Sequence, residues 1–119
     1  MPLVLVVEDN ADVREILVET VEAFGYEVMA AETAAEAVVS VTDREPDAIL
    51  LDIILPDARG TAGLERLKQV RPDVPIIMVT ANSDDDLARE TLKRGAFDYV
   101  MKPFDRGQLA RALEAAVAR

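Results

Sequence analysis

Five short apolar segments alternate with longer amphipathic segments along the whole chain, and this alternation constrains the fold more than any other feature. Residues 3–7, 48–51 and 76–79 are almost continuously apolar, which is typical of parallel strands buried on both faces. Residues 27–30 and 98–101 are more mixed in polarity and are expected at the sheet edges. Repeated βα units of this kind predict a parallel sheet covered by helices.

Five amphipathic segments with helical spacing lie between and after these strands. The expected N-caps are Asn10, Thr33 (in a capping-box pattern with Glu36), Ser83 and Asp105, and the expected stops are Gly25, Pro72 and Gly95. The third helix is expected to carry Leu64, Leu67 and Val70 on one face. Strands joined by right-handed crossovers predict an α/β, doubly wound five-stranded parallel sheet with five helices. With the second and fifth segments at the edges, the strands fit the flavodoxin-like order 2-1-3-4-5, one of two common orders.

The residue types that are missing exclude several classes of site. The 119 residues include no cysteine and no histidine, which rules out disulfides, thiolate or imidazole metal sites and histidine-dependent hydrolases. No apolar run reaches the roughly 20 residues of a membrane span, and no signal peptide precedes the first strand. We therefore expect a cytoplasmic protein without membrane contact, and the length predicts a single domain over residues 1–119 with no output domain.

Acidic residues outnumber basic ones by 23 to 13, and the net charge of −10 disfavours direct nucleic-acid binding. The excess lies in the first half of the chain. Residues 1–57 hold 14 acidic and 2 basic residues, whereas residues 58–119 hold 9 acidic and 11 basic residues. Solvated helix faces account for most of these acids, but Glu8 and Asp9 directly follow an apolar strand.

Polar residues at the ends of the predicted strands form the candidate site. Glu8 and Asp9 end the first strand, Asp52 the third, Thr80 the fourth and Lys102 the fifth. In a sheet of this order the ligand crevice lies at the carboxyl ends of the strands, between strands one and three. Clustered carboxylates repel one another unless a cation joins them, and oxygen-only donors favour Mg²⁺, or Mn²⁺.

Such a cation would leave Asp52 ionised, and an aspartate nucleophile can form an aspartyl phosphate. The ammonium of Lys102 and the hydroxyl of Thr80 are suited to hold the oxygens of an incoming phosphoryl group. The residue types at the strand ends therefore indicate phosphoryl chemistry.

Four motifs together resemble the receiver domain of two-component response regulators: Glu8-Asp9, Asp52-Ile53-Ile54-Leu55-Pro56 with Gly60, Thr80-Ala81, and Lys102-Pro103-Phe104. The likeness covers the whole chain, and the spacing of all four motifs fits. It implies that Asp52 accepts a phosphoryl group from a histidine kinase or a histidine phosphotransfer protein. The chain would then catalyse its own phosphorylation and a slow autodephosphorylation without being a conventional enzyme.

The resemblance also implies which residues hold the metal. Glu8, Asp9, Asp52 and the carbonyl of Ile54 would bind Mg²⁺. Glu8 stands where the family more often has Asp, and its longer arm suggests a water-mediated contact.

The same resemblance implies a switch beside the acceptor. Thr80 and Lys102 would contact the phosphoryl oxygens, and Tyr99 would change rotamer on activation. The family pattern further implies a cis peptide bond between Lys102 and Pro103.

Two surfaces are expected to bind partners. The first helix is apolar over a wider face than one core stripe needs, so some of Val13, Ile16 and Val18 should stay exposed for the kinase, which is also expected to contact the loop after Lys102. The resemblance places the output on the face formed by helix four, strand five and helix five. A basic face there suits an acidic target, an output domain or a second copy of the chain. The basic residues expected on it are Arg89, Lys93, Arg94, Arg106 and Arg111.

Two residues are expected to set the lifetime of the phosphoaspartate. In receivers the positions two beyond Asp52 and Thr80, here Ile54 and Asn82, flank the phosphoryl group. Ile54 offers no hydrogen bond to an attacking water, so slow hydrolysis is expected.

Three other functions fit the chain less well. A Mg²⁺-dependent phosphatase of the dehalogenase type needs a second acid two residues after its nucleophile, and Ile54 stands there. A flavodoxin-like FMN module needs a hydroxyl- and glycine-rich loop after strand one, where the acids of residues 8–12 would repel a phosphate. A receiver-like module that only binds proteins leaves the acidic and basic residues at the strand ends without a role.

Overall fold

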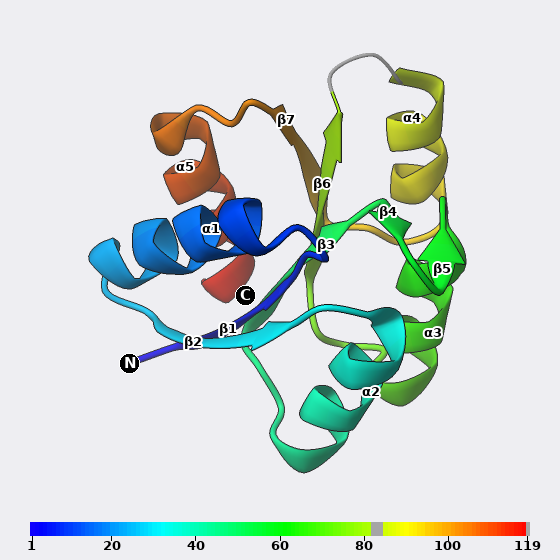
Figure 1. Ribbon diagram of the computed structural model, residues 1–119, viewed down its shortest axis with the longest axis horizontal. Coiled ribbons are helices and arrows are strands. Elements are labelled where there is room, and N and C mark those ends of the chain that lie inside the picture. Colours follow the sequence, from blue (N-terminus) through cyan, green and yellow to red (C-terminus); the bar gives the residue numbers. More distant parts are fainter. Residues whose placement is uncertain (82–84, 119) are drawn as a thin grey trace.

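The computed structural model describes residues 1–81 and 85–118, and its centre is a five-stranded parallel sheet between two layers of helices (Figure 1). The strands are β1 (Leu3–Val7), β2 (Glu27–Ala31), β3 (Ala48–Asp52), β6 (Ile76–Ala81) and β7 (Asp98–Lys102). Their order across the sheet is β2-β1-β3-β6-β7, so the predicted flavodoxin-like order is confirmed.

The helices divide between the two faces of the sheet (Figure 1). α1 (Ala11–Ala23) and α5 (Arg106–Val117) cover one face, and α2 (Ala34–Asp43), α3 (Ala62–Val70) and α4 (Asp85–Lys93) cover the other. Side chains of β1 alternate between these layers: Val4 and Val6 pack with α1 and α5, whereas Leu5 and Val7 pack with α2 and α3. Double coverage explains why the central strands are continuously apolar and the edge strands β2 and β7 are mixed.

Most of the predicted helix caps are confirmed. The side chains of Asn10, Thr33 and Asp105 accept backbone N–H groups in the first turns of α1, α2 and α5. The predicted start at Ser83 lies outside the described residues, and described α4 begins at Asp85. A full capping box would also have the carboxylate of Glu36 accept the N–H of Thr33. That carboxylate instead accepts the N–H of the preceding residue, Glu32, at 3.2 Å.

The face of α3 that carries Leu64, Leu67 and Val70 becomes less buried toward the end of the helix. Leu64 and Leu67 are fully buried, whereas Val70, the last residue of the helix, is 36% exposed. Among the described residues, no helix has the length and apolar composition that a membrane crossing requires.

A short antiparallel hairpin that the sequence did not predict follows β3. It consists of β4 (Ile54–Leu55) and β5 (Ala58–Arg59) and lies directly after Asp52. Leu55 is buried, whereas Ile54 is 52% exposed. The hairpin therefore presents Ile54 to solvent next to the predicted phosphoryl acceptor.

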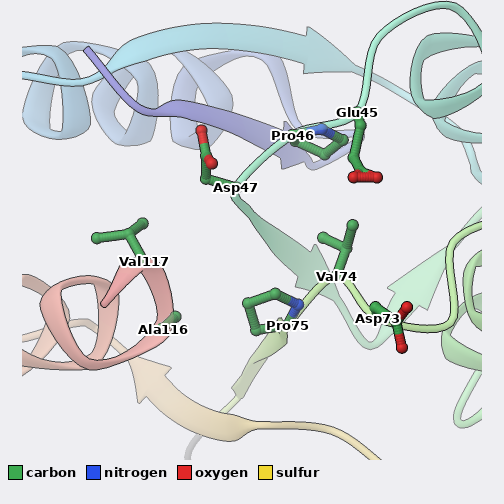
Figure 2. A pocket seen from close by; sticks show the side chains of 8 residues that line it. All are labelled: Glu45, Pro46, Asp47, Asp73, Val74, Pro75, Ala116 and Val117. Atoms are coloured by element: carbon green, nitrogen blue, oxygen red, sulfur yellow. The ribbon is translucent and has the colours of Figure 1, made fainter. Parts of the chain in front are cut away.

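Figure 2 shows a hollow at the edge of the sheet where β3 and β6 begin, opposite the edge that carries Asp52. Its volume is about 200 Å³, and the loops that precede β3 and β6 line it together with the end of α5. This hollow lies at the amino ends of the strands, away from the edge where ligands bind in sheets of this type.

Candidate functional site

Three carboxylates meet at the carboxyl edge of the sheet. Glu8 and Asp9 follow β1, and Asp52 ends β3, the strand paired with β1 in register. One oxygen from each of the three carboxylates lies within 4.8 Å of the others. Glu8 and Asp52 are only 2% and 8% exposed, whereas Asp9 is open to solvent. The sheet topology thus brings together the acids that the sequence singled out.

The ammonium of Lys102 enters this cluster from the end of β7. It donates a hydrogen bond to Oε1 of Glu8 at 2.6 Å and lies 3.5 Å from Oδ2 of Asp52. Burial lowers the pKa of Lys102, but the hydrogen bond to Glu8 and the charges of Asp52 and Glu8 outweigh burial, so this pKa is raised above its ordinary value. Lys102 is therefore a charged group at neutral pH.

Asp52 is held on its other side by the hairpin. The backbone N–H of Ile54 donates to Oδ1 of Asp52 at 3.2 Å, so one oxygen faces the hairpin and the other faces Lys102. Thr80, which is 1% exposed, lies on β6 between the strands that carry Asp52 and Lys102. It is one position beyond the residue that pairs with Asp52. The carboxylate of Asp52 thus shares one edge of the sheet with the residues that carry the hydroxyl and the ammonium, Thr80 and Lys102.

Three further predictions concern the cis peptide bond, Tyr99 and Asn82. The Lys102–Pro103 peptide bond is cis, as the resemblance implied. Tyr99 is partly buried and packs against the core layer under α2, α3 and α4. Asn82, the second residue expected to govern hydrolysis, lies outside the described residues.

The donor set of the cluster fits a hard divalent cation. All three side chains offer carboxylate oxygens, which Mg²⁺ prefers over nitrogen or sulfur. Three carboxylates against one ammonium leave a formal charge of −2, and a divalent cation would offset it. Glu8, Asp9 and Asp52 are the side chains that could hold such an ion.

Two residues that the sequence did not single out contact the loops of this site. Arg14 donates to the backbone carbonyls of Glu8 and Asp9. Asp57 lies in the turn of the hairpin that follows Asp52 and accepts the N–H of Ala34. No periodicity or motif points to either residue: Arg14 contacts the backbone of a nearby loop and the side chain of Glu32, and Asp57 contacts the backbone of the distant α2. Only the tertiary structure identifies these contacts.

Comparison with known proteins agrees with this geometry. The family model described as "Response regulator receiver domain" matches residues 4–114. The phosphate regulon transcriptional regulatory protein PhoB of Pseudomonas aeruginosa is 41% identical over 121 aligned positions, covering 98% of this chain and 52% of that protein. The DNA-binding transcriptional regulator NtrC of Escherichia coli is 35% identical over 98% of this chain and 25% of its own length. The chain therefore spans about half or a quarter of these curated relatives.

Solved structures resemble the chain over nearly its full length. The receiver domain of NtrX from Brucella abortus superposes with a TM-score of 0.91 at 32% identity, covering 97% of this chain and 98% of that one. The receiver domain of a sensor histidine kinase from Pseudomonas aeruginosa superposes with a TM-score of 0.89 at 32% identity, covering 99% and 98%. That second structure holds a magnesium ion coordinated in its active site cleft.

Proposed function

Since the chain belongs to the response regulator receiver domain family, we propose that it is a phosphorylation-dependent switch of two-component signalling, with Asp52 as the phosphoryl acceptor. The observation that carries this proposal is the position of Asp52. This buried carboxylate lies beside two further acids and 3.5 Å from the Lys102 ammonium. Such a site suits an anionic nucleophile that must meet an anionic phosphoryl group.

The transfer is a displacement at phosphorus. A carboxylate oxygen of Asp52 forms the new O–P bond while the N–P bond of a phosphohistidine breaks, and the electron pair of that bond stays on the imidazole nitrogen. The Lys102 ammonium and the Thr80 hydroxyl bind the phosphoryl oxygens during the displacement. The chain contains no histidine, so a donor histidine lies outside these 119 residues. A histidine kinase, a histidine phosphotransfer protein or a small phosphodonor can supply Asp52 with a phosphoryl group.

Glu8, Asp9, Asp52 and the carbonyl of Ile54 would hold Mg²⁺, or Mn²⁺, at this site. A bound divalent cation offsets the charge of the acids as the phosphoryl group approaches. Glu8 is already hydrogen-bonded to Lys102 and to the N–H of Asn10, which supports an indirect, water-mediated contact from this residue. The burial of Asp52 keeps bulk water away from the acceptor oxygens.

The output surface is the face formed by α4, β7 and α5, and the coupling runs from Thr80 to Tyr99. Tyr99 lies on β7 and packs with the layer that includes Leu87 of α4. Three basic residues expected on this face are engaged within the chain. Arg94 pairs with acids of α3 and α4, and Arg89 lies 3.4 Å from Asp86 of α4. Arg106 lies 5.4 Å from the centre of the Phe24 ring. The face suits an acidic target, an output domain or a second copy of the chain more than a nucleic acid.

Labelling with an acyl phosphate tests the proposed function. The unaltered chain in Mg²⁺ should gain the mass of one phosphoryl group, and Asp52→Asn or an excess of chelator should abolish that gain. Asp43→Asn, a change to an exposed acid at the end of α2, is the matched control and should label normally. Undiminished labelling of Asp52→Asn would overturn the assignment.

A further inference from the structure

Arg14 links the loop of the first two acids to the start of the segment before α2. One terminal nitrogen of its guanidinium donates to the backbone carbonyls of Glu8 and Asp9, at 3.0 and 3.3 Å. The other terminal nitrogen lies 3.1 Å from Oε1 of Glu32. Because one planar group makes all three contacts, it fixes the position of the loop relative to Glu32.

Asp57 makes a comparable link from the other side of the site. It lies in the turn between β4 and β5, and its two carboxylate oxygens accept the N–H groups of Ala34 and Ala35 at 2.9 and 3.0 Å. These are the first two residues of α2, whose N–H groups have no partner within the helix. Arg66 lies 3.4 Å from the same carboxylate. The hairpin after Asp52 is thus fastened to the first turn of α2.

Both loops are therefore fastened to one short segment, residues 32–36, which we name the β2–α2 junction. The junction is braced internally. The N–H of Glu32 donates to the carboxylate of Glu36 at 3.2 Å, and the N–H of Glu36 donates to the hydroxyl of Thr33 at 3.1 Å. The strand before the junction also accepts the N–H of Glu8 through the carbonyl of Ala31. The junction is a common support for two loops that are far apart in the sequence.

We propose that Arg14 and Asp57 are positioning residues for the acidic cluster, because they hold its two loops on the β2–α2 junction. The inference rests on the proposed function, since it concerns the affinity of the cluster for a divalent cation. Ile54, whose carbonyl is a proposed ligand, lies in the same hairpin as Asp57. Arg14 donates to the backbone carbonyls of Glu8 and Asp9, two of the other proposed ligand residues. Loops that are already in place lose less conformational freedom when the ion binds.

Two conservative variants test the inference by isothermal titration of the folded chain with Mg²⁺. Asp57→Asn replaces one acceptor oxygen by an amide nitrogen, so one of the two N–H groups of α2 loses its partner. Arg14→Lys keeps the positive charge but cannot reproduce the planar, three-way contact. Each variant should weaken Mg²⁺ binding about tenfold, the lower end of the effect of residues that orient metal ligands.

A matched control separates positioning from simple charge. Asp12→Asn removes one negative charge from an exposed acid in the first turn of α1, in the same acidic half of the chain. It should change the Mg²⁺ affinity by less than about twofold at physiological salt, because exposed charges are screened.

Amide hydrogen exchange separates positioning from a merely structural helix cap. Mg²⁺ should slow exchange at Ala34 and Ala35 in the unaltered chain, and it should fail to do so in Asp57→Asn. A role confined to capping α2 would speed this exchange while leaving the Mg²⁺ affinity unchanged, and that result would overturn the inference.

The remaining outcomes are also decisive. If the unaltered chain binds Mg²⁺ and both variants bind it equally well, the inference is wrong and the proposed function stands. If the unaltered chain binds no Mg²⁺, the proposed function fails, and the inference fails with it. Should circular dichroism show that Asp57→Asn does not fold, Arg14→Lys, which acts from the other side of the junction, decides the question.

Discussion

Lys102 donates its shortest hydrogen bond to Glu8, at 2.6 Å, whereas its ammonium lies 3.5 Å from the carboxylate of Asp52. The ammonium is thus closer to the buried acid that is not the proposed phosphoryl acceptor. Asp52 has a contact of its own, from the N–H of Ile54. A cation that binds in the cluster therefore competes with the Lys102 ammonium for the carboxylate of Glu8, one of its candidate ligands.

Removing this ammonium should strengthen Mg²⁺ binding. Lys102→Met eliminates a positive charge that repels the ion and occupies Glu8, so the dissociation constant should fall at least about fivefold. Labelling by an acyl phosphate should slow in the same variant, because no ammonium binds the phosphoryl oxygens. Titration calorimetry checks the first effect and intact mass the second. Lys93→Met, a change to an exposed residue of α4, is the matched control. Weaker Mg²⁺ binding by Lys102→Met would contradict the prediction.

The side chain of Ile54 should set the lifetime of the phosphoaspartate. It is 52% exposed on the hairpin beside Asp52 and offers no hydrogen bond to an attacking water. Ile54→Asn should shorten the half-life several-fold, since a tenfold change corresponds to only about 1.4 kcal/mol of barrier. The half-life follows from the decay of the phosphorylated mass after the donor is removed. Val39→Asn places the same residue at an exposed site on α2, 62% exposed, and should leave the half-life unchanged. An unchanged half-life in Ile54→Asn would exclude this side chain as the determinant.

The first helix should bind the phosphodonor protein through Ile16. Ile16 is 53% exposed, whereas Val13 and Val18 are partly buried against the core, so the expected apolar patch is reduced to one fully presented side chain. Ile16→Ala should slow phosphoryl transfer from a cognate kinase about tenfold, as truncation of a central interface residue does. Labelling by an acyl phosphate should stay normal, because this donor needs no docking surface. Val39→Ala is the control, and equal losses with both donors would argue against docking at Ile16.

The contribution of Asp57 to stability should vanish in acid. The hydrogen bond from Ala34 holds the pKa of Asp57 below its ordinary value. A carboxyl with a lowered folded-state pKa contributes stability above its unfolded pKa of about 4, and that contribution is lost as the pH falls through the folded value. Asp57→Asn should therefore lower the free energy of unfolding by about 1 kcal/mol at neutral pH, and by progressively less as the acid pH approaches and passes the folded-state pKa.

Urea unfolding of the variant and the unaltered chain at neutral and at acid pH checks this difference. Asp43→Asn changes an exposed acid at the far end of α2 and should show little difference at either pH. A loss in Asp57→Asn that is equally large in acid would show that the charge of Asp57 does not act through the helix cap.

Much of the fold follows from local features of the sequence. The buried strands are continuous apolar runs and the edge strands are mixed, so the two edge positions could be predicted, and they fit one of the two common orders of doubly wound sheets. The helix starts at Asn10 and Asp105 were predictable because a cap acts on a residue two or three positions away. The hairpin after β3 was not predictable, since two strands of two residues each have no measurable periodicity.

The site could be predicted as a set of residues but not as a set of contacts. Parallel strands carry their carboxyl ends to one edge, which brings Glu8, Asp9 and Asp52 together whatever their rotamers. The choice of Glu8 as the nearer partner of Lys102 depends on side-chain conformations that residue order does not encode. The contact of Asp57 with Ala34 joins residues 23 positions apart through a carboxylate and a backbone group, and no sequence motif describes such a pair.

The hydrogen bond between Lys102 and Glu8 joins two residues that are 94 positions apart, at the ends of the first and the last strand in the chain. A chain that lacks β7 can still contain every acid of the cluster, but it has no ammonium beside them. The site therefore exists only when the whole sheet is complete. A copy that lacks this strand holds the clustered negative charge of the three acids without the ammonium that offsets part of it. The complete set of charges at the site is therefore present only in a chain that contains both the first and the last strand of the sheet.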